Sequence, residues 1–117
     1  MRRTLPLAGP LVVKSFTERE QRALKLILNS GIPFIELGIF GSYARNEYKA
    51  TSDIDMLAIV EEHPPRRISG ELREELDSIG VQLTYSTMEY FTSSNSNFAK
   101  HVREDYIRRL KYGEKLL

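Results

Sequence analysis

The stretch that decides the fold covers residues 39–60 and reads IFGSYARNEYKATSDIDMLAIV. An apolar run ends at Gly41-Ser42, a short segment and a polar loop follow, and a second apolar run begins with Asp53-Ile54-Asp55. Short apolar runs that end at glycine or polar residues are typical of buried strands. We therefore predict a strand over residues 34–40, a short helix over 42–47 and a second strand over 53–60.

The flanking sequence extends this unit in both directions. Thr17 and Glu20 have the spacing of a capping box at the start of a helix predicted over residues 17–30. A second helix is predicted over 69–79, a strand over 81–85 and a helical turn over 87–91. Near the C-terminus, apolar residues recur every four positions and predict a final helix: Phe98, Val102, Tyr106 and Leu110. The alternation of helices and strands places the chain in the α/β or α+β class.

Length and composition narrow the functional classes. The 117 residues predict a single domain over 1–117, with residues 1–15 as an extended lead-in that holds two prolines. The chain has no cysteine, which excludes disulfides, and it has no apolar run long enough to cross a bilayer. Its net charge of +1 gives no broad surface for nucleic acid, which we do not expect as a direct substrate. We expect a cytoplasmic protein without a membrane partner.

Four residues of the central stretch have the chemistry of a phosphate and metal site. Gly41 has no Cβ, so a phosphate can approach its backbone, and Ser42 at the start of the short helix adds N–H and O–H donors. Asp53 and Asp55 lie two apart on a strand, so both side chains point to one face. Two carboxylates at a strand end suit Mg²⁺, which prefers a few carboxylates together with substrate phosphates.

Arg45, one turn into the short helix, could also reach a phosphate; a surface ion pair is an equal alternative. Gly41 could be only a tight turn, and each aspartate could be a capping or surface charge. Two adjacent carboxylates at the head of an apolar strand repel each other without a cation, which favours the metal interpretation.

The pattern Gly41-Ser42, ten intervening residues and Asp53-Ile54-Asp55 resembles the signature of the DNA polymerase β nucleotidyltransferase superfamily. The fuller strings, Gly-Ser-Tyr-Ala-Arg and Ser-Asp-Ile-Asp-Met-Leu, resemble its minimal nucleotidyltransferase branch. This local signature covers about a fifth of the chain, and the order of elements extends the resemblance over most of the rest.

The resemblance implies a nucleotidyltransferase fold, a small mixed β-sheet flanked by helices. It implies that Asp53 and Asp55 are the catalytic residues and bind a divalent metal, Mg²⁺ or Mn²⁺, while Gly41 and Ser42 bind the triphosphate. The implied reaction transfers a nucleoside monophosphate, AMP from ATP, to a protein or small-molecule acceptor. The implied partner is a small helical protein of the HEPN class, for which this chain would be the antitoxin; we also allow for a homodimer.

The sequence departs from the superfamily at the third carboxylate. The matching position on the strand over residues 81–85 is Gln82, a weak ligand for a hard cation that cannot accept a proton from the acceptor. Loss of a general base typically costs about 10²–10⁴ in rate. Glu89 or Glu104 could substitute in space. The alternative is a catalytically weakened nucleotide-binding module that acts by forming a complex with a partner protein.

Overall fold

The computed structural model describes residues 16–47, 49 and 52–114. The predicted lead-in over residues 1–15 lies outside these, and the single-domain expectation for 1–117 stays a prediction. The elements follow in the order α1 (Glu18–Asn29), β1 (Glu36–Phe40), α2 (Gly41–Ala44), β2 (Ile54–Ile59), α3 (Arg66–Asp77), β3 (Val81–Ser86), α4 (Met88–Ser93), α5 (Asn97–Asp105) and β4 (Ile107–Lys111).

The strands form one mixed sheet in the order β3-β2-β1-β4. β1 is antiparallel to both β2 and β4, whereas β2 and β3 are parallel. The parallel pair is joined through α3, as a crossover between parallel strands requires. The predicted mixed sheet flanked by helices is confirmed.

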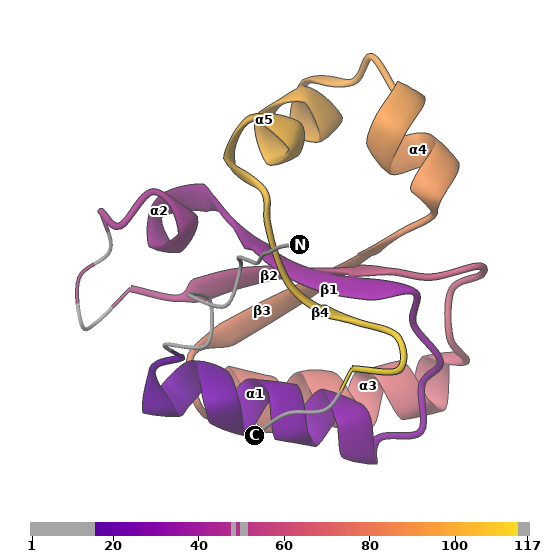
Figure 1. The fold of residues 1–117 in the computed structure, drawn as a ribbon. Coiled ribbons are helices and arrows are strands. Elements are labelled where there is room, and N and C mark those ends of the chain that lie inside the picture. The colour runs from indigo at the N-terminus through magenta and orange to yellow at the C-terminus, as the bar shows by residue number, and fades with distance from the viewer. Residues whose placement is uncertain (1–15, 48, 50–51, 115–117) are drawn as a thin grey trace, which may run out of the picture.

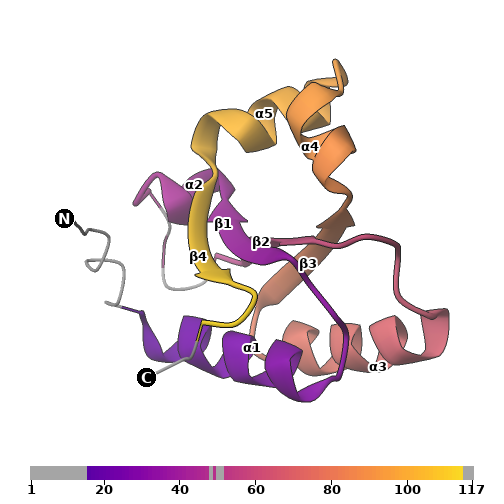
Figure 2. The same cartoon turned by 45° about the vertical axis from the view of Figure 1, so that its right-hand side comes forward.

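Helices cover both faces of this sheet (Figures 1 and 2). α1 and α3 lie side by side on one face, over the larger apolar core, which contains the alternating β2 residues Ile54, Met56 and Ala58. α4 and α5 form a pair on the other face, where Leu57 and Ile59 pack with Val102 of α5. Because successive side chains of a strand point to opposite faces, Asp55 lies on the α4–α5 side of the sheet.

The first helix starts close to where its capping residues predict. The Thr17 side chain accepts a hydrogen bond from the backbone N–H of Glu20 at 3.2 Å. Gly31 follows the helix with a φ of +80°, the left-handed conformation in which glycine carries no steric penalty. The Glu20 carboxylate, which a capping box would place at the start of the helix backbone, instead accepts hydrogen bonds from Arg109 of β4 and Tyr43 of α2.

The predicted C-terminal helix is wrong in its second half. α5 ends at Asp105, Tyr106 has the extended backbone of φ −60° and ψ 130°, and β4 then pairs with β1. The four-residue spacing of apolar side chains misled the prediction because Val102 packs in the core under α5, whereas Leu110 packs in the core on the other face of the sheet. The periodicity thus runs across two elements that face different cores.

β4 contains a bulge and depends on a glycine in β1. Gly38 pairs with Arg108 but Leu37 pairs with Leu110, so that Arg109 is an extra residue in β4. The Tyr106 ring lies over Gly38, where an added Cβ would come within 2.2 Å of it. The bulge redirects the strand locally, as bulges do, and Arg109 reaches α1 from it.

In the part of the chain that the structure describes, no helix combines the length and the apolar character that a membrane span needs.

Candidate active site

The two aspartates and Gln82 form one side of the site, which we call the strand wall. Asp53 directly precedes β2, and Asp55 is its second residue. Asp55 pairs with Phe40 at the end of β1 on one side and with Gln82 of β3 on the other. The position that sequence reasoning assigned to the third carboxylate therefore lies beside the aspartates.

The turn after β1 forms the opposite side, which we call the bend wall: Gly41 and Ser42 at the start of α2. Gly41 has a φ of +74°, and a Cβ added there would lie 2.8 Å from Oδ2 of Asp55. Only glycine leaves room for that carboxylate beside the backbone. The two walls thus converge: the Asp55 carboxylate at the start of β2 lies against the Gly41 backbone in the turn after β1.

The helix that carries the bend wall is shorter than predicted. α2 spans Gly41–Ala44 and replaces the predicted helix over 42–47. Its macrodipole is correspondingly small, so any attraction for a phosphate rests on the first-turn N–H groups and the Ser42 hydroxyl rather than on aligned peptide dipoles.

The environment of Asp55 disfavours its charge. Burial, followed by the negative charge of Asp53, raises the pKa of Asp55 above its ordinary value. A cation that joins the two carboxylates offsets both effects, because its charge stabilises the ionised form. The electrostatics of the strand wall therefore match a site that binds a positively charged ligand.

Gln82 is hydrogen-bonded to one of the two aspartates of the strand wall. Its Nε2 donates a hydrogen bond to Oδ2 of Asp53 at 2.9 Å. In the described residues no group of three or more Asp, Glu, His or Cys side chains is arranged to hold a metal ion, so neither Glu89 nor Glu104 completes such a set. A metal here would have two carboxylates as protein ligands, and the remaining positions would belong to phosphate oxygens and water. Mg²⁺ takes this combination readily, so the donor set fits it.

Arg45 forms ion pairs with two acidic residues. Its Nε donates to Glu47 at 2.9 Å and its Nη1 to Asp105, the last residue of α5, at 2.5 Å. The guanidinium is half-exposed. In this arrangement Arg45 links α2 to α5, and its predicted contact with a phosphate stays a prediction.

Sequence reasoning missed the residues that support both walls. Arg19 and Glu20 of α1 contact segments on either side of the site, and Arg109 reaches Glu20 from β4. The sequence separation of Glu20 and Arg109 is 89 residues, so no local pattern connects them. One feature of the sequence could have indicated Glu20: it is a charged residue on the otherwise apolar, buried side of an amphipathic helix.

Comparison with known proteins places the chain among nucleotidyltransferases. The family model described as the nucleotidyltransferase domain matches residues 21–112. A Methanocaldococcus jannaschii protein, named as a candidate protein adenylyltransferase, is 36% identical over 78 residues, which are 63% of this chain and 82% of that protein. The protein adenylyltransferase MntA of Thermococcus cleftensis is 46% identical over 44 residues, or 38% of this chain and 44% of that protein.

Solved structures share the fold at low sequence identity. A toxin–antitoxin structure with AMP-PNP has a TM-score of 0.60 and 20% identity, and covers 83% of this chain and 76% of that chain. The complex of a tri-AMPylated Shewanella oneidensis HEPN toxin with its MNT antitoxin has a TM-score of 0.55 and 19% identity, with 80% and 70% covered. With the convergent aspartates and Gly-Ser turn in place and a family model that spans most of its length, the chain belongs to the nucleotidyltransferase domain family.

Proposed function

We propose that this protein transfers AMP from Mg²⁺-bound ATP to a side chain of a partner protein, and that the partner is a HEPN-type toxin whose activity the transfer suppresses. The observation that carries the proposal is the approach of the Asp55 carboxylate to the backbone of Gly41. It brings carboxylates that can hold a cation next to a turn that can accept a phosphate. Two relatives named for adenylyl transfer and two similar toxin–antitoxin structures support the choice of donor and partner.

In this proposal each residue has a separate role. Asp53 and Asp55 hold the metal, which when bound would neutralise phosphate charge and align the α-phosphate for in-line attack. The Gly41 backbone and the Ser42 hydroxyl orient the triphosphate. Gln82 keeps the Asp53 carboxylate in place through its amide but, having no titratable proton, leaves deprotonation of the acceptor to another group or to solvent.

The test is a transfer assay with the co-purified partner. Purified complex is incubated with Mg²⁺ and ATP labelled at the α-phosphate, and then at the γ-phosphate. We expect label on the partner only from the α-phosphate, and none with the Asp53→Asn/Asp55→Asn variant. Label from the γ-phosphate would indicate a kinase instead, and no label from either would refute transfer.

A second candidate is a binding module that neutralises its partner by complex formation alone. The observation in its favour is Gln82, which occupies the place of a carboxylate and binds Asp53 as a neutral amide. The two functions separate in one experiment, in which the partner is co-expressed with the Asp53→Asn/Asp55→Asn variant. Neutralisation that survives in this folded variant supports the binding module, and neutralisation that disappears supports transfer.

A further inference from the structure

Two consecutive residues in the first turn of α1 contact the segments that carry the two walls of the site. Successive residues of a helix point about 100° apart, so neighbours can reach different segments. Arg19 reaches the residues that lead into β2 and β3, which carry the strand wall, and Glu20 reaches α2, which carries the bend wall. Neither residue belongs to the nucleotidyltransferase signature in residues 41–55.

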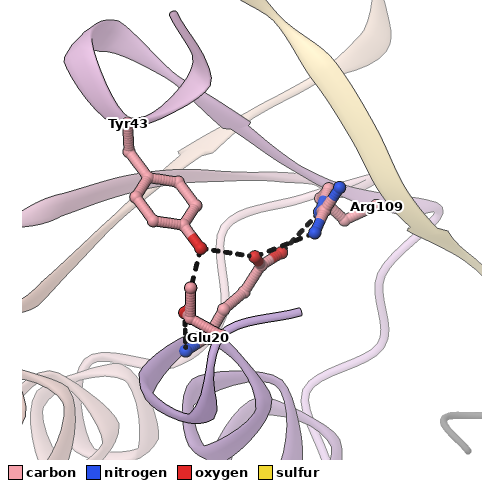
Figure 3. Close-up of polar contacts among 4 residues, drawn as sticks. Glu20, Tyr43 and Arg109 are labelled. Atoms are coloured by element: carbon pink, nitrogen blue, oxygen red, sulfur yellow. Dashed lines mark hydrogen bonds and ion pairs between the residues drawn. The ribbon is translucent and has the colours of Figure 1, made fainter. Parts of the chain in front are cut away.

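Glu20 contacts α2 through its buried carboxylate (Figure 3). Glu20 has no exposed surface, and the Arg109 guanidinium binds it through Nε at 2.5 Å and Nη2 at 3.0 Å. The Tyr43 hydroxyl lies 2.9 Å from Oε1 of Glu20 and 2.9 Å from the hydroxyl of Thr17. Such two-point pairing by arginine offsets much of the cost of burying the charge.

The hydrogen positions in this cluster follow from its chemistry. A carboxylate paired with arginine only accepts, so Tyr43 must donate to Glu20. The Tyr43 oxygen then accepts from the Thr17 hydroxyl, whose own oxygen accepts from the Glu20 backbone N–H at 3.2 Å. Both hydroxyl groups thus donate to an acceptor within the cluster, which restrains the Tyr43 ring. Tyr43 directly follows Ser42, so a restrained ring also restrains the orientation of α2.

Arg19 contacts the segments that lead into β2 and β3 through two backbone carbonyl groups. Nη1 of Arg19 donates to the carbonyl oxygen of Ser52 at 2.8 Å and to that of Gly80 at 3.3 Å. Ser52 directly precedes Asp53, and Gly80 directly precedes β3, which carries Gln82. A Cβ at Gly80 would lie 2.7 Å from that nitrogen and 3.6 Å from Oδ1 of Asp53, so the guanidinium and the carboxylate border the same space.

We propose that the first turn of α1 is the positioning platform of the active site: Glu20, through Tyr43, sets the bend that binds phosphates, and Arg19 sets the strand ends that bind the metal. Arg19, Glu20 and Tyr43 are positioning residues. The proposal rests on the nucleotidyltransferase function proposed above, and it assigns each half of the site its own support. Disruption of one support therefore weakens the binding of one ligand and leaves the binding of the other unchanged.

The experiment compares two variants with two matched controls. Tyr43→Phe removes one hydroxyl and is paired with Tyr112→Phe at an exposed tyrosine. Arg19→Gln is paired with Arg22→Gln at an exposed arginine of the same helix. The probes are Mn²⁺ without nucleotide, followed by its electron paramagnetic resonance signal, and AMP-PNP with saturating Mg²⁺, followed by calorimetry.

We expect Tyr43→Phe to weaken AMP-PNP binding about tenfold, the size of one lost hydrogen bond to a charged group, and to change Mn²⁺ binding less than twofold. We expect Arg19→Gln to weaken Mn²⁺ binding about tenfold, as loss of a group that orients metal ligands typically does. Both controls should match the unmodified protein. Equal losses of both ligands in the two variants, or no loss in folded variants, would overturn the proposal.

A readout without ligands separates this proposal from the function on which it rests. Hydrogen exchange of the ligand-free protein should be faster at the α2 amides in Tyr43→Phe and at the first residues of β2 and β3 in Arg19→Gln. If the unmodified protein binds neither probe, the proposed function fails, and this exchange pattern still decides whether α1 positions the two segments. Uniformly faster exchange in both variants would show that α1 only stabilises the fold.

Discussion

The strand wall and the bend wall are held in different ways. The strand wall sits at the start of β2, which is hydrogen-bonded to β1 on one side and to β3 on the other. The bend wall sits on a four-residue helix that side chains attach to its surroundings: Tyr43 to α1, and Arg45 to α5. The strand wall has main-chain ladders in addition to its Arg19 contacts, whereas the bend wall depends on a few long-range side-chain contacts. The proposed metal-binding half therefore lies on the sheet itself, whereas the proposed phosphate-binding half depends on a few side-chain contacts with α1 and α5.

The largest effect should come from removing the charges of the strand wall. In the Asp53→Asn/Asp55→Asn variant we expect adenylyl transfer to fall by at least about 10³-fold, because both protein ligands of the metal are lost. The fold should persist, since asparagine preserves the shape and relieves the repulsion. Label transfer measures the rate, and circular dichroism checks the fold. Transfer within tenfold of the unmodified protein would mean that the chemistry lies elsewhere.

The next largest effect should be an increase in the rate of adenylyl transfer. Gln82→Glu places a carboxylate of the same length beside Asp53 and Asp55, and we expect transfer to rise by about 10²-fold as a general base is restored. Gln82→Met, which has a similar volume and no polar amide, should not accelerate transfer. Rates measured with α-labelled ATP decide the matter. An unchanged rate in the glutamate variant would show that Gln82 does not limit the reaction.

The bend wall should tolerate change less at its glycine than anywhere else. Gly41→Ala introduces a Cβ 2.8 Å from the Asp55 carboxylate at a φ of +74°, which costs about 1–2 kcal/mol of stability. AMP-PNP affinity should fall about tenfold because the carboxylate must move. Gly70→Ala is the matched control, because its Cβ would meet open space within α3. That variant should gain about 0.5–1 kcal/mol in chemical denaturation.

A smaller effect should come from the ion pair that ties the bend wall to α5. If Arg45 serves phosphates, Asp105 competes for it, and Asp105→Asn should tighten AMP-PNP binding about threefold. Arg45→Ala should weaken it by a similar factor and leave the fold intact, because ion pairs of a half-exposed arginine contribute little to stability. Calorimetry with both variants tests the idea. Weaker binding in Asp105→Asn would show that the ion pair positions α2 instead.

The smallest effect concerns pH. The pKa of Asp55 is raised in the folded protein by burial and by Asp53, so its ionisation favours unfolding. The stabilising contribution is present below the unfolded-state pKa of about 3.9 and is lost as pH rises through the higher folded value. Melting temperatures between pH 3 and 7 should therefore fall less with rising pH in Asp55→Asn than in the unmodified protein. Added Mg²⁺ should raise the melting temperature of the unmodified protein alone.

The two walls also differ in how well the sequence predicts them. Asp53, Asp55 and the Gly41 turn lie within 15 residues, and their strands are short apolar runs, so local patterns predicted the strands and the turn that carry them. The mixed sheet was predicted from the resemblance to the nucleotidyltransferase superfamily, because the apolar runs indicated only the α/β or α+β class, and β4 was assigned to a helix. The convergence of carboxylate and turn follows from antiparallel pairing of neighbouring strands, the most local tertiary contact that a sheet offers.

The supports of the site were not predictable for the opposite reason. The partners Glu20 and Arg109 come from the two ends of the described chain, and their pairing depends on β4, whose register includes a bulge. Arg45 illustrates the same limit: it is the C-cap of α2 instead of a residue within the predicted helix, and its acidic partner Asp105 comes from a helix 60 residues away. Side-chain partners across such separations depend on the assembled sheet, which no periodicity encodes.

The extra residue in β4 has a consequence for how this chain can vary. A regular strand alternates its faces, so without the bulge Arg109 would occupy the position opposite Leu37 that Leu110 now fills. The insertion supplies a cation for α1 without displacing the apolar residue beside it. Evolution should therefore gain or lose three things together: the acid at position 20, the base at position 109 and one residue of strand length. Homologues with an apolar residue in place of the acid are expected to have a strand shorter by one.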